Sequence, residues 1–394
     1  MCVIEINLKN GMFFSGLKFF RGGVLCMLWG IHMLDKIRMI ENVIPMHIKI
    51  GQDSNPIFIW GCGALAIQVY KFCQKYSIGI NGSFVNIESS QDYLEDLPVY
   101  DLEDLMCRYP KFSVIVGIAD YIYATAYLKE IANVENIYCL PSVCCEVTNL
   151  ISYGYMEKNK EVLNALYNDL ADEKSKACLI AYFESRLNDR ADYMFSYYDK
   201  SINYYKNDVF KLGADETLLD CGACVGDAVW SFIDAVEGTY QSVLAIEPDM
   251  DNYTFLLKEI ERRKLKNIIV KQVCAYNENT HVHFSGNTQS GRIDNANNER
   301  ELYEAVTIDY LCGELKMAED VSIIKINFAS AVPEILEGAR KLLQEKKPRL
   351  IIRAAYDEKE LVKIYLSIKN INPSYRLYLR YTLGLPQGLT LMAV

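Results

Sequence analysis

The 394-residue chain lacks several features that would point to particular partners. It has no run of lysines or arginines and its formal net charge is −10, so we expect no general affinity for nucleic-acid phosphates or anionic membranes. Residues 22–34 form an apolar run, but the run is too short to span a bilayer and no small-x-small cleavage site follows it. We therefore predict neither a nucleic-acid partner nor stable membrane insertion, and the oligomeric state stays open.

The cysteines lack the regular spacing of a disulfide framework. There are 13, an odd number, which is typical of a reducing compartment and predicts a cytoplasmic location. Cys221-x-x-Cys224 and His281-x-His283 have spacings that occur in metal sites. A zinc site would need the two pairs to converge, and cysteines that pack a local turn are the simpler interpretation. We predict no metal site.

The most informative stretch is residues 216–227. Residues 217–220 predict a short buried strand, which a glycine turn and a helix follow. Gly222 and Gly226 allow a sharp bend and the close approach of a ligand, because neither has a Cβ. The positive end of the following helix would point at that ligand. Asp220 closes the strand, where an acid can reach a cationic or amino group.

A second strand, residues 242–247, ends in an acid. Glu247 at this tip lies where ribose hydroxyls bind in a βαβ unit, and one carboxylate can accept from both hydroxyls. The order D-x-G-x-x-x-G-D replaces the G-x-G-x-x-G of NAD sites, which favours S-adenosylmethionine as the cofactor. A glycine turn that only packs a helix on a sheet is the alternative. The predicted cofactor-binding residues are Asp220, Gly222, Ala223, Gly226, Asp227, Glu247 and Asp249.

These stretches resemble the FkbM family of methyltransferases over about half of the chain, from Tyr204 to Val394. The resemblance implies a class I methyltransferase sheet of seven strands with a terminal antiparallel pair, S-adenosylmethionine as methyl donor, and a sugar or glycan hydroxyl as acceptor. The matched stretches, of which the first two are fairly specific, are residues 220–227, 245–249, 325–327, 335–339, 347–352 and 375–380.

The acceptor half departs from the family pattern. The family's fourth strand looks like K-I-D-x-E-G-A-E, whereas this chain has Asn327, Ala329 and Val332 where an aspartate and two glutamates are expected. Asparagine and alanine cannot take up a proton at neutral pH. Asp309 and Asp357 are therefore candidate bases, and Asn327 completes the set of predicted catalytic residues.

An earlier region, Asn55 to Pro141, also alternates between strand and helix and predicts a parallel sheet. Gly61-x-Gly63-x-x-Ala66 satisfies a dinucleotide fingerprint. The ribose-binding acid expected after the second strand is absent, since that position falls near Asn86. This stretch resembles the nucleotide-sugar-associated Rossmann-like units that precede some glycan-modifying enzymes, and a fold that no longer binds a dinucleotide is an equal alternative.

We therefore expect an α/β protein with two Rossmann-like units. Its predicted parts are an N-terminal extension of uncertain role (1–50), a Rossmann-like domain (51–145), a helical linker (146–209) and a methyltransferase-like domain (210–394). The predicted strands of the last part are residues 217–220, 242–247, 268–272, 282–284, 306–308, 322–327, 349–354, 375–379 and 389–394.

Three functions compete at this point. The first is S-adenosylmethionine-dependent O-methylation of a small-molecule or glycan acceptor with a rearranged acceptor site. The second is a non-catalytic relative that keeps nucleoside binding and serves as a binding or scaffolding subunit. The third is an NAD(P)-dependent enzyme that uses the unit around Gly61.

Overall fold

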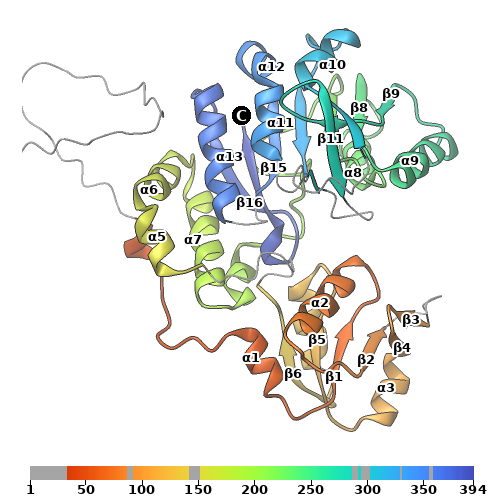
Figure 1. Ribbon diagram of the computed structural model, residues 1–394, viewed down its shortest axis with the longest axis vertical. Helices are drawn as coiled ribbons and strands as arrows, with labels where there is room; N and C mark the ends of the chain where they lie inside the picture. Colours follow the sequence, from red (N-terminus) through yellow and green to blue (C-terminus); the bar gives the residue numbers. More distant parts are fainter. Residues whose placement is uncertain are drawn as a thin grey trace, which may run out of the picture. The chain divides into compact units, whose positions relative to one another are not determined.

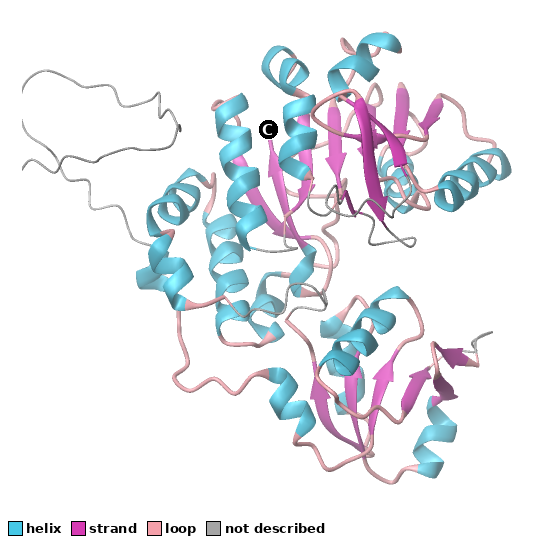
Figure 2. Ribbon diagram, viewed as in Figure 1, coloured by secondary structure: helices cyan, strands magenta, loops and turns pink. Residues whose placement is uncertain are grey.

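The computed structural model describes residues 33–86, 92–141, 151–285, 292–293, 302–328, 331–354 and 358–394. These residues belong to one compact unit, His32–Val394, whose elements are labelled in Figure 1 and coloured by type in Figure 2. Asp357, Ala329 and residues 1–32 lie outside the described residues. Within the described ranges, no helix is both long and apolar enough to cross a membrane.

The first sheet has six strands in the order β3-β4-β2-β1-β5-β6, and every pairing in it is parallel except that of β3 with β4. Both faces of β1 are buried, as expected for a parallel sheet covered by helices. The predicted Rossmann-like unit is confirmed. Its strands and helices are β1 (Ile57–Trp60), α2 (Ala64–Lys75), β2 (Gly82–Val85), β3 (Tyr93–Leu94), β4 (Leu97–Asp101), α3 (Leu102–Arg108), β5 (Phe112–Val116), α4 (Tyr121–Lys129) and β6 (Val134–Tyr138).

The second sheet has seven strands in the order β16-β17-β15-β14-β7-β8-β9. Strand β17 is antiparallel to both of its neighbours and the other pairings are parallel, so the predicted sheet with its terminal antiparallel pair is confirmed. The strands are β7 (Thr217–Cys221), β8 (Ser242–Ile246), β9 (Ile268–Lys271), β14 (Ile323–Ile326), β15 (Arg349–Arg353), β16 (Leu377–Tyr381) and β17 (Leu389–Ala393).

Alternating side chains of this sheet face two different hydrophobic clusters. Leu219 and Ile324 belong to a cluster with helices α11, α12 and α13, whereas Leu218 and Ile323 pack with helices α8 and α9 on the other face. This alternation is the period of two expected for a strand buried on both sides. The helices are α8 (Asp227–Ala235), α9 (Met250–Arg262), α11 (Val332–Gly338), α12 (Arg340–Glu345) and α13 (Glu358–Ile371).

The helical segment between the two sheets packs on β16. The Leu379 amide donates to the Ser175 hydroxyl at 3.0 Å, and the Ala171 amide donates to the Leu377 carbonyl at 2.8 Å. These bonds tie the predicted linker to the edge of the seven-stranded sheet. The segment consists of α5 (Tyr153–Lys158), α6 (Lys160–Asp169), α7 (Glu173–Leu187) and the 3-10 helix η2 (Ala191–Tyr197).

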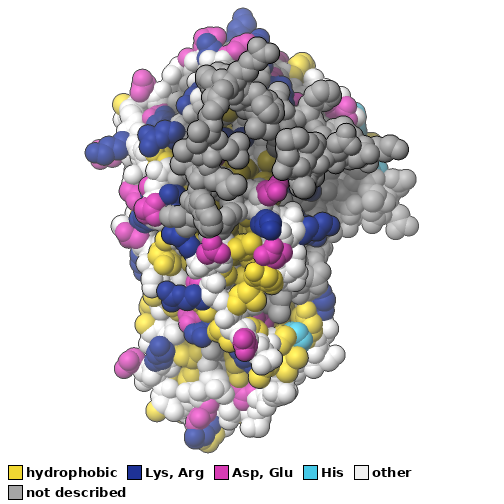
Figure 3. Space-filling view, turned by 90° about the vertical axis from the view of Figure 1, so that its left-hand side faces the viewer, with side chains coloured by type: hydrophobic (Ala, Val, Ile, Leu, Met, Phe, Trp, Pro, Cys, Tyr) yellow, Lys and Arg dark blue, Asp and Glu magenta, His cyan; other side chains and the backbone are white. Residues whose placement is uncertain are grey.

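Residues 33–40 of the predicted N-terminal extension are held against this helical segment, whereas Met46 and Ile50 pack in the core of the six-stranded sheet. Met33 is fully buried, in the 3-10 helix η1 (Met33–Lys36), and the Arg38 amide donates to a Glu184 carboxylate oxygen at 2.7 Å. Helix α1 (Met46–Gly51) follows. Hydrophobic side chains gather on part of the face that Figure 3 shows. In residues 33–50, the exposed large apolar side chains are Met39, Ile40, Ile44 and Ile48.

Three details differ from the sequence-based expectations. A four-stranded sheet, β10-β13-β11-β12, replaces the single short strand predicted at 282–284. Of the strand predicted at 306–308, only Val306 lies in a strand, β13, because Thr307 caps helix α10 (Ile308–Glu314) by accepting from the Tyr310 amide. The single helix predicted from about 333 to 343 is divided at Ala339 into α11 and α12. The strands of the small sheet are β10 (Cys274–Ala275), β11 (Thr280–Ser285), β12 (Arg292–Ile293) and β13 (Leu302–Val306).

Candidate functional site

The strand order of the seven-stranded sheet reverses at β7. The chain passes from β7 to β8 on one side, while β14 lies on the other side. In open α/β sheets, ligands bind in the crevice outside the carboxyl ends of the strands at such a switch point. Three predicted residues, Asp220, Gly222 and Asn327, lie at these strand ends, and the Asn327 amide donates to the Cys221 carbonyl at 3.1 Å.

Residues 222–226 form a tight turn, which we call the glycine turn. The amides of Gly222 and Ala223 both donate to the Ile246 carbonyl, at 3.0 and 3.1 Å, and the Gly226 amide donates to the Ala223 carbonyl at 2.8 Å. Gly222 and Gly226 have φ values of 79° and 86°, a left-handed conformation that favours glycine. The turn is therefore fastened to the end of the neighbouring strand β8.

The sharp bend predicted for the two glycines is confirmed by their positive φ values, and internal packing gives a further reason for them. A Cβ on Gly222 would lie 2.7 Å from the Asn327 carbonyl oxygen, and a Cβ on Gly226 would lie 2.5 Å from the Trp230 ring and 2.7 Å from Leu256. These neighbours belong to the protein itself. Backbone conformation and internal packing therefore require glycine at both positions, without any ligand.

Glu247 lies against the glycine turn. Its Oε2 accepts from the Cys224 amide at 2.7 Å, and its Oε1 accepts from the Asp249 amide at 3.0 Å and from the Asn252 side chain at 3.4 Å. The side chain is buried, and burial raises the pKa of its carboxyl group above the ordinary value even though these donors oppose the shift. The predicted ribose-binding acid and the predicted turn are thus in direct contact.

The remaining predicted cofactor residues surround this contact. Asp249 caps helix α9 by accepting from the Asn252 amide at 2.9 Å, and Asp227 is the exposed first residue of α8. Ala223 is fully buried inside the glycine turn. The structure therefore brings all seven predicted cofactor-binding residues to the ends of β7 and β8.

A buried ion pair joins β7 and β14 below the glycine turn. Lys325 Nζ lies 2.7 Å from Asp220 Oδ1, and both side chains are at most 2% exposed. Burial raises the pKa of Asp220 to about 6, against the opposing attraction of Lys325. Burial alone would lower the pKa of Lys325, but its attraction to Asp220 raises it overall. The second oxygen of Asp220 has no hydrogen-bond partner within the described part of the chain.

Lys325 was not among the predicted site residues, although the sequence carries a signal for it. All four residues of β14, Ile323–Ile326, are buried, and the lysine interrupts an otherwise apolar strand. A fully buried lysine needs a partner of opposite charge, and Asp220 interrupts the apolar strand β7 in the same way. Pairing of these two strands would have identified the ion pair.

Of the three predicted catalytic residues, the structure describes two, Asp309 and Asn327, and each makes its own separate contacts. Asp309 accepts from the amides of Lys341 and Leu342, at 2.8 and 2.9 Å, and so caps the first turn of α12. Asn327 lies beside Gly222 and is half-buried, whereas Asp357 falls outside the described residues. Within the described ranges, no three His, Cys, Asp or Glu side chains converge as a metal site requires.

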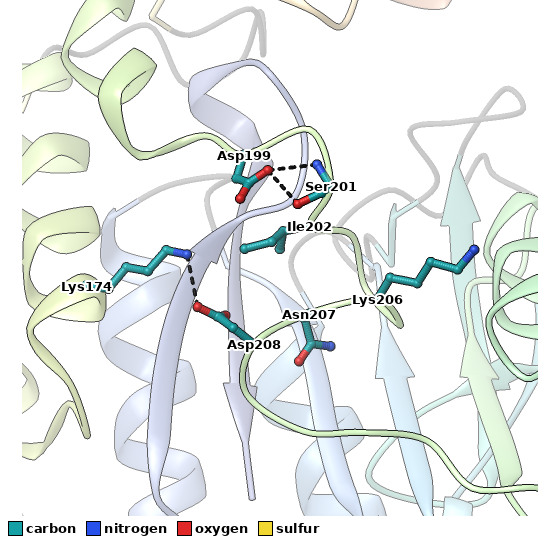
Figure 4. Close-up of a pocket in the computed structure, with 7 residues that line it drawn as sticks. All are labelled: Lys174, Asp199, Ser201, Ile202, Lys206, Asn207 and Asp208. Atoms are coloured by element: carbon teal, nitrogen blue, oxygen red, sulfur yellow. Dashed lines mark hydrogen bonds and ion pairs between the residues drawn. The ribbon is translucent and has the colours of Figure 1, made fainter.

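A polar cleft of about 420 Å³ lies between the helical segment and residues 199–208. Figure 4 shows Asp208 on its wall, where it accepts from Lys174 Nζ at 3.0 Å. The other oxygen of Asp208 accepts from the buried Arg380 at 2.7 Å, and Arg380 also pairs with Asp172 at 2.7 Å. The cleft therefore has a fixed polar wall, and the residues that line it are Lys174, Asp199, Ser201, Ile202, Lys206, Asn207 and Asp208.

The seven-stranded sheet and its switch point define the class of fold found in S-adenosylmethionine-dependent methyltransferases. The crystal structure of methyltransferase FkbM from Methylobacillus flagellatus KT is similar to this chain, with a TM-score of 0.62 at 17% sequence identity. The similarity covers 89% of this chain and 92% of that one. Residues 210–394 make up less than half of the chain. A similarity that covers 89% of the chain therefore extends into the six-stranded sheet.

Two further structures match only in part. Aeropyrum pernix fibrillarin, which has natively bound S-adenosyl-L-methionine, has a TM-score of 0.30 and 11% identity over 47% of this chain and 70% of its own. A SAM-dependent methyltransferase from Aquifex aeolicus has a TM-score of 0.26 and 15% identity over 46% and 84%. The fold assignment rests on the Methylobacillus structure alone. No protein-family model and no curated protein matches the chain.

Proposed function

We propose that the chain belongs to the FkbM methyltransferases and uses S-adenosylmethionine to methylate a hydroxyl group of a sugar or glycan. The observation that carries this proposal is the 2.7 Å hydrogen bond from the Cys224 amide to Glu247 Oε2. It places an acid and a glycine turn side by side at a topological switch point, which is the position of nucleoside sites in this class of sheet.

The residues of the site fit this cofactor. The two oxygens of a carboxylate offer about four acceptor positions, and the three donors to Glu247 leave capacity for a ribose hydroxyl. The carboxylate of Asp220 is fully buried, so it would act on the ammonium group of the methionine portion through its negative charge and not by direct contact. When bound, S-adenosylmethionine supplies a methyl group that is already activated for displacement. Glu247 and Asp220 would hold and orient it.

The acceptor side relies on positioning more than on proton transfer. The amide side chain of Asn327 cannot take a proton, and the carboxylate of Asp309 is engaged by two amides of α12. Asp357 remains the predicted base. Because the donor is activated, correct placement of the acceptor hydroxyl accounts for most of the rate acceleration in this mechanism.

Asn327 also favours a second candidate function. If no residue accepts the proton of the hydroxyl, the chain is a non-catalytic relative that binds the nucleoside and serves as a binding or scaffolding subunit. The NAD(P)-dependent alternative is less favoured, because Asn86, at the position of the ribose-binding acid, is exposed and uncharged. A cytoplasmic location is part of the same proposal, since the nine cysteines among the described residues are free thiols.

A methyl-transfer assay tests the proposal. The purified chain is incubated with S-adenosylmethionine carrying a labelled methyl group and with a panel of monosaccharides, nucleotide-linked sugars and glycans. We expect label in one class of acceptor, lost in Glu247→Ala and kept in Asp251→Asn, which removes a nearby exposed acid of α9. Cofactor binding without transfer to any acceptor would favour the non-catalytic relative, and absence of cofactor binding would contradict both.

A further inference from the structure

The ion pair between Asp220 and Lys325 connects the two strands that border the switch point. The two residues are direct partners in the parallel register of β7 and β14. Their outer neighbours in the sheet are apolar, Ala245 on β8 and Ile351 on β15. The pair is therefore an isolated polar contact in the middle of an apolar surface, where two charges are costly to bury.

Lys325 makes a second contact, which reaches into the glycine turn. Its Nζ donates to the Gly222 carbonyl at 2.9 Å while it lies 2.7 Å from Asp220. Asn327, the residue after β14, donates its amide to the Cys221 carbonyl at 3.1 Å, next to Gly222 in the chain. The Lys325 side chain thus holds the first residue of the turn, and the Asn327 amide holds the residue before it.

The outer side of the ion pair is covered by residues 204–205 and helix α8. Tyr205 is 3% exposed, and its ring packs edge to face with Phe232 of α8 at a centroid distance of 5.4 Å. Among the described residues, the charged and titratable groups that face the pair are Asp227 of α8, Tyr204, Tyr205, Cys221 and Cys224. Lys325 is the cation in this described set, so it offsets the buried charge of Asp220.

We propose that Lys325 is a positioning residue, whose ammonium group fixes the Gly222 carbonyl and the Asp220 carboxylate and so sets the shape and charge of the glycine turn. Its effect on ligand binding rests on the proposed function, with S-adenosylmethionine as the ligand. Its hold on the turn is a property of the free protein. Without the ammonium, a fully buried carboxyl group takes up a proton, so its negative charge no longer attracts a cationic ligand.

Hydrogen exchange in the free protein tests the hold on the turn. The peptides that contain residues 222–226 are compared in the wild type, Lys325→Met and the double variant Asp220→Asn/Lys325→Met. Lys346→Met, on a partly exposed lysine paired with Glu319, is the matched control. We expect exchange of the turn amides to be about tenfold faster in both Lys325 variants and unchanged in the control.

If Lys325→Met fails to fold, the double variant Asp220→Asn/Lys325→Met still gives a result. The double variant leaves no buried charge without a partner. Exchange at the wild-type rate in the Lys325 variants would overturn the assignment. This outcome does not depend on any ligand, so it can be told apart from failure of the proposed function.

The affinity for S-adenosylmethionine between about pH 5 and about pH 9 tests the effect on charge. We expect Lys325→Met to weaken binding about tenfold near neutral pH, and to regain affinity as the pH rises and Asp220 ionises again. A lysine with a merely structural role would weaken binding equally at every pH, and that result would overturn the charge-setting role. If the wild type binds no S-adenosylmethionine, the proposed function fails and the exchange data still decide the positioning role.

Discussion

The turns that follow β1 and β7 begin with the same kind of backbone hydrogen bond, although they belong to different sheets. The Gly61 amide donates to the Phe84 carbonyl at the end of the next strand, at 2.9 Å. The Gly222 amide makes the same bond to Ile246 at 3.0 Å. Each of these glycines is the first residue after the strand at which its sheet reverses order.

Each of these two glycines also lies close to a backbone carbonyl oxygen just after the strand on its other side. A Cβ on Gly61 would lie 2.8 Å from the Gly117 carbonyl oxygen, and a Cβ on Gly222 would lie 2.7 Å from that of Asn327. Both have positive φ, 123° and 79°. Two switch points in one chain thus require glycine for the same internal reason, so a glycine at this place does not by itself indicate a ligand.

The two turns differ in charge. The N-terminal turn is surrounded by the apolar Trp60 and by the Ser83 hydroxyl, which donates to the carbonyls of Ile59 and Gly61. Among the described residues, charged groups lie around the turn after β7, whereas the hydrogen bonds of the first turn involve none. These groups are Asp220, Lys325 and Glu247. The comparison teaches that buried charge, rather than the glycine pattern, distinguishes the candidate site from a structural turn.

The largest expected effect comes from removing one member of the buried pair. Lys325→Met leaves the Asp220 carboxylate without a partner, so we expect the free energy of unfolding to fall by about 3–5 kcal/mol. Chemical denaturation measures this change. Asp220→Asn/Lys325→Met should recover much of the loss, and a double variant that is no more stable than the single one would show that the ion pair is not the source.

Alanine at either glycine should be nearly as costly. Gly222→Ala and Gly61→Ala each combine a left-handed backbone with a close approach to a carbonyl oxygen, so we expect each to lower the unfolding free energy by roughly 2–4 kcal/mol. Gly63→Ala is the control, because nothing lies within 4 Å of its Cβ and its φ is −94°. Unequal effects at Gly61 and Gly222 would break the equivalence of the two turns.

The pH dependence of stability should also distinguish the charged turn after β7 from the uncharged turn after β1. The folded-state pKa of Asp220 is raised from 3.8 to about 6, so its contribution to stability is complete below about pH 4 and is lost as the pH rises through about 6. We therefore expect the stability of the wild type relative to Asp220→Asn to fall over this window. A difference that stays constant from about pH 4 to about pH 7 would contradict the burial of this carboxyl group.

A smaller effect is expected at the uncharged turn. Ser83→Ala removes a buried hydroxyl that donates to the Gly61 carbonyl, which should cost about 1–2 kcal/mol. Thermal unfolding gives this value, and calorimetry should show unchanged affinity for S-adenosylmethionine. Loss of that affinity in Ser83→Ala would mean that the N-terminal turn takes part in the same ligand site.

The smallest expected effect concerns Asp309. Asp309→Ala removes the cap of α12, so we expect a loss of about 1 kcal/mol in stability and no change in the rate of methyl transfer. The labelled-methyl assay, run alongside thermal unfolding, measures both. A general base contributes roughly a hundredfold or more in rate, and a decrease of that size would restore Asp309 as the base.

Much of the fold follows from the sequence, because both sheets are runs of short buried strands separated by helices and turns. The predicted strand 217–220 and the observed β7 differ by one residue, and so do the predicted strand 242–247 and the observed β8. The four-stranded sheet that includes β10 and β13 was missed, since its strands are short or partly exposed and lack a clear alternation. Long-range pairing, rather than local pattern, forms that sheet.

The candidate site was predictable where its chemistry is local in sequence. Glu247 and the glycine turn could be placed from strand order, because the carboxyl ends of neighbouring parallel strands meet at one edge of a sheet. The partner of Asp220 is signalled only as a lysine in an apolar strand, since Lys325 lies 103 residues beyond Gly222, to which it also bonds. Only the register of β7 and β14 brings these groups together.

The most direct test of the central claim is isothermal titration of the wild type and of Glu247→Ala with S-adenosylmethionine, and of the wild type with NADH. We predict heat of binding with S-adenosylmethionine in the wild type, its loss in Glu247→Ala, and no heat with NADH. Removing the Glu247 carboxylate should weaken binding by roughly ten- to a hundredfold or more. Binding of NADH without S-adenosylmethionine, or equal affinity in Glu247→Ala, would contradict the account.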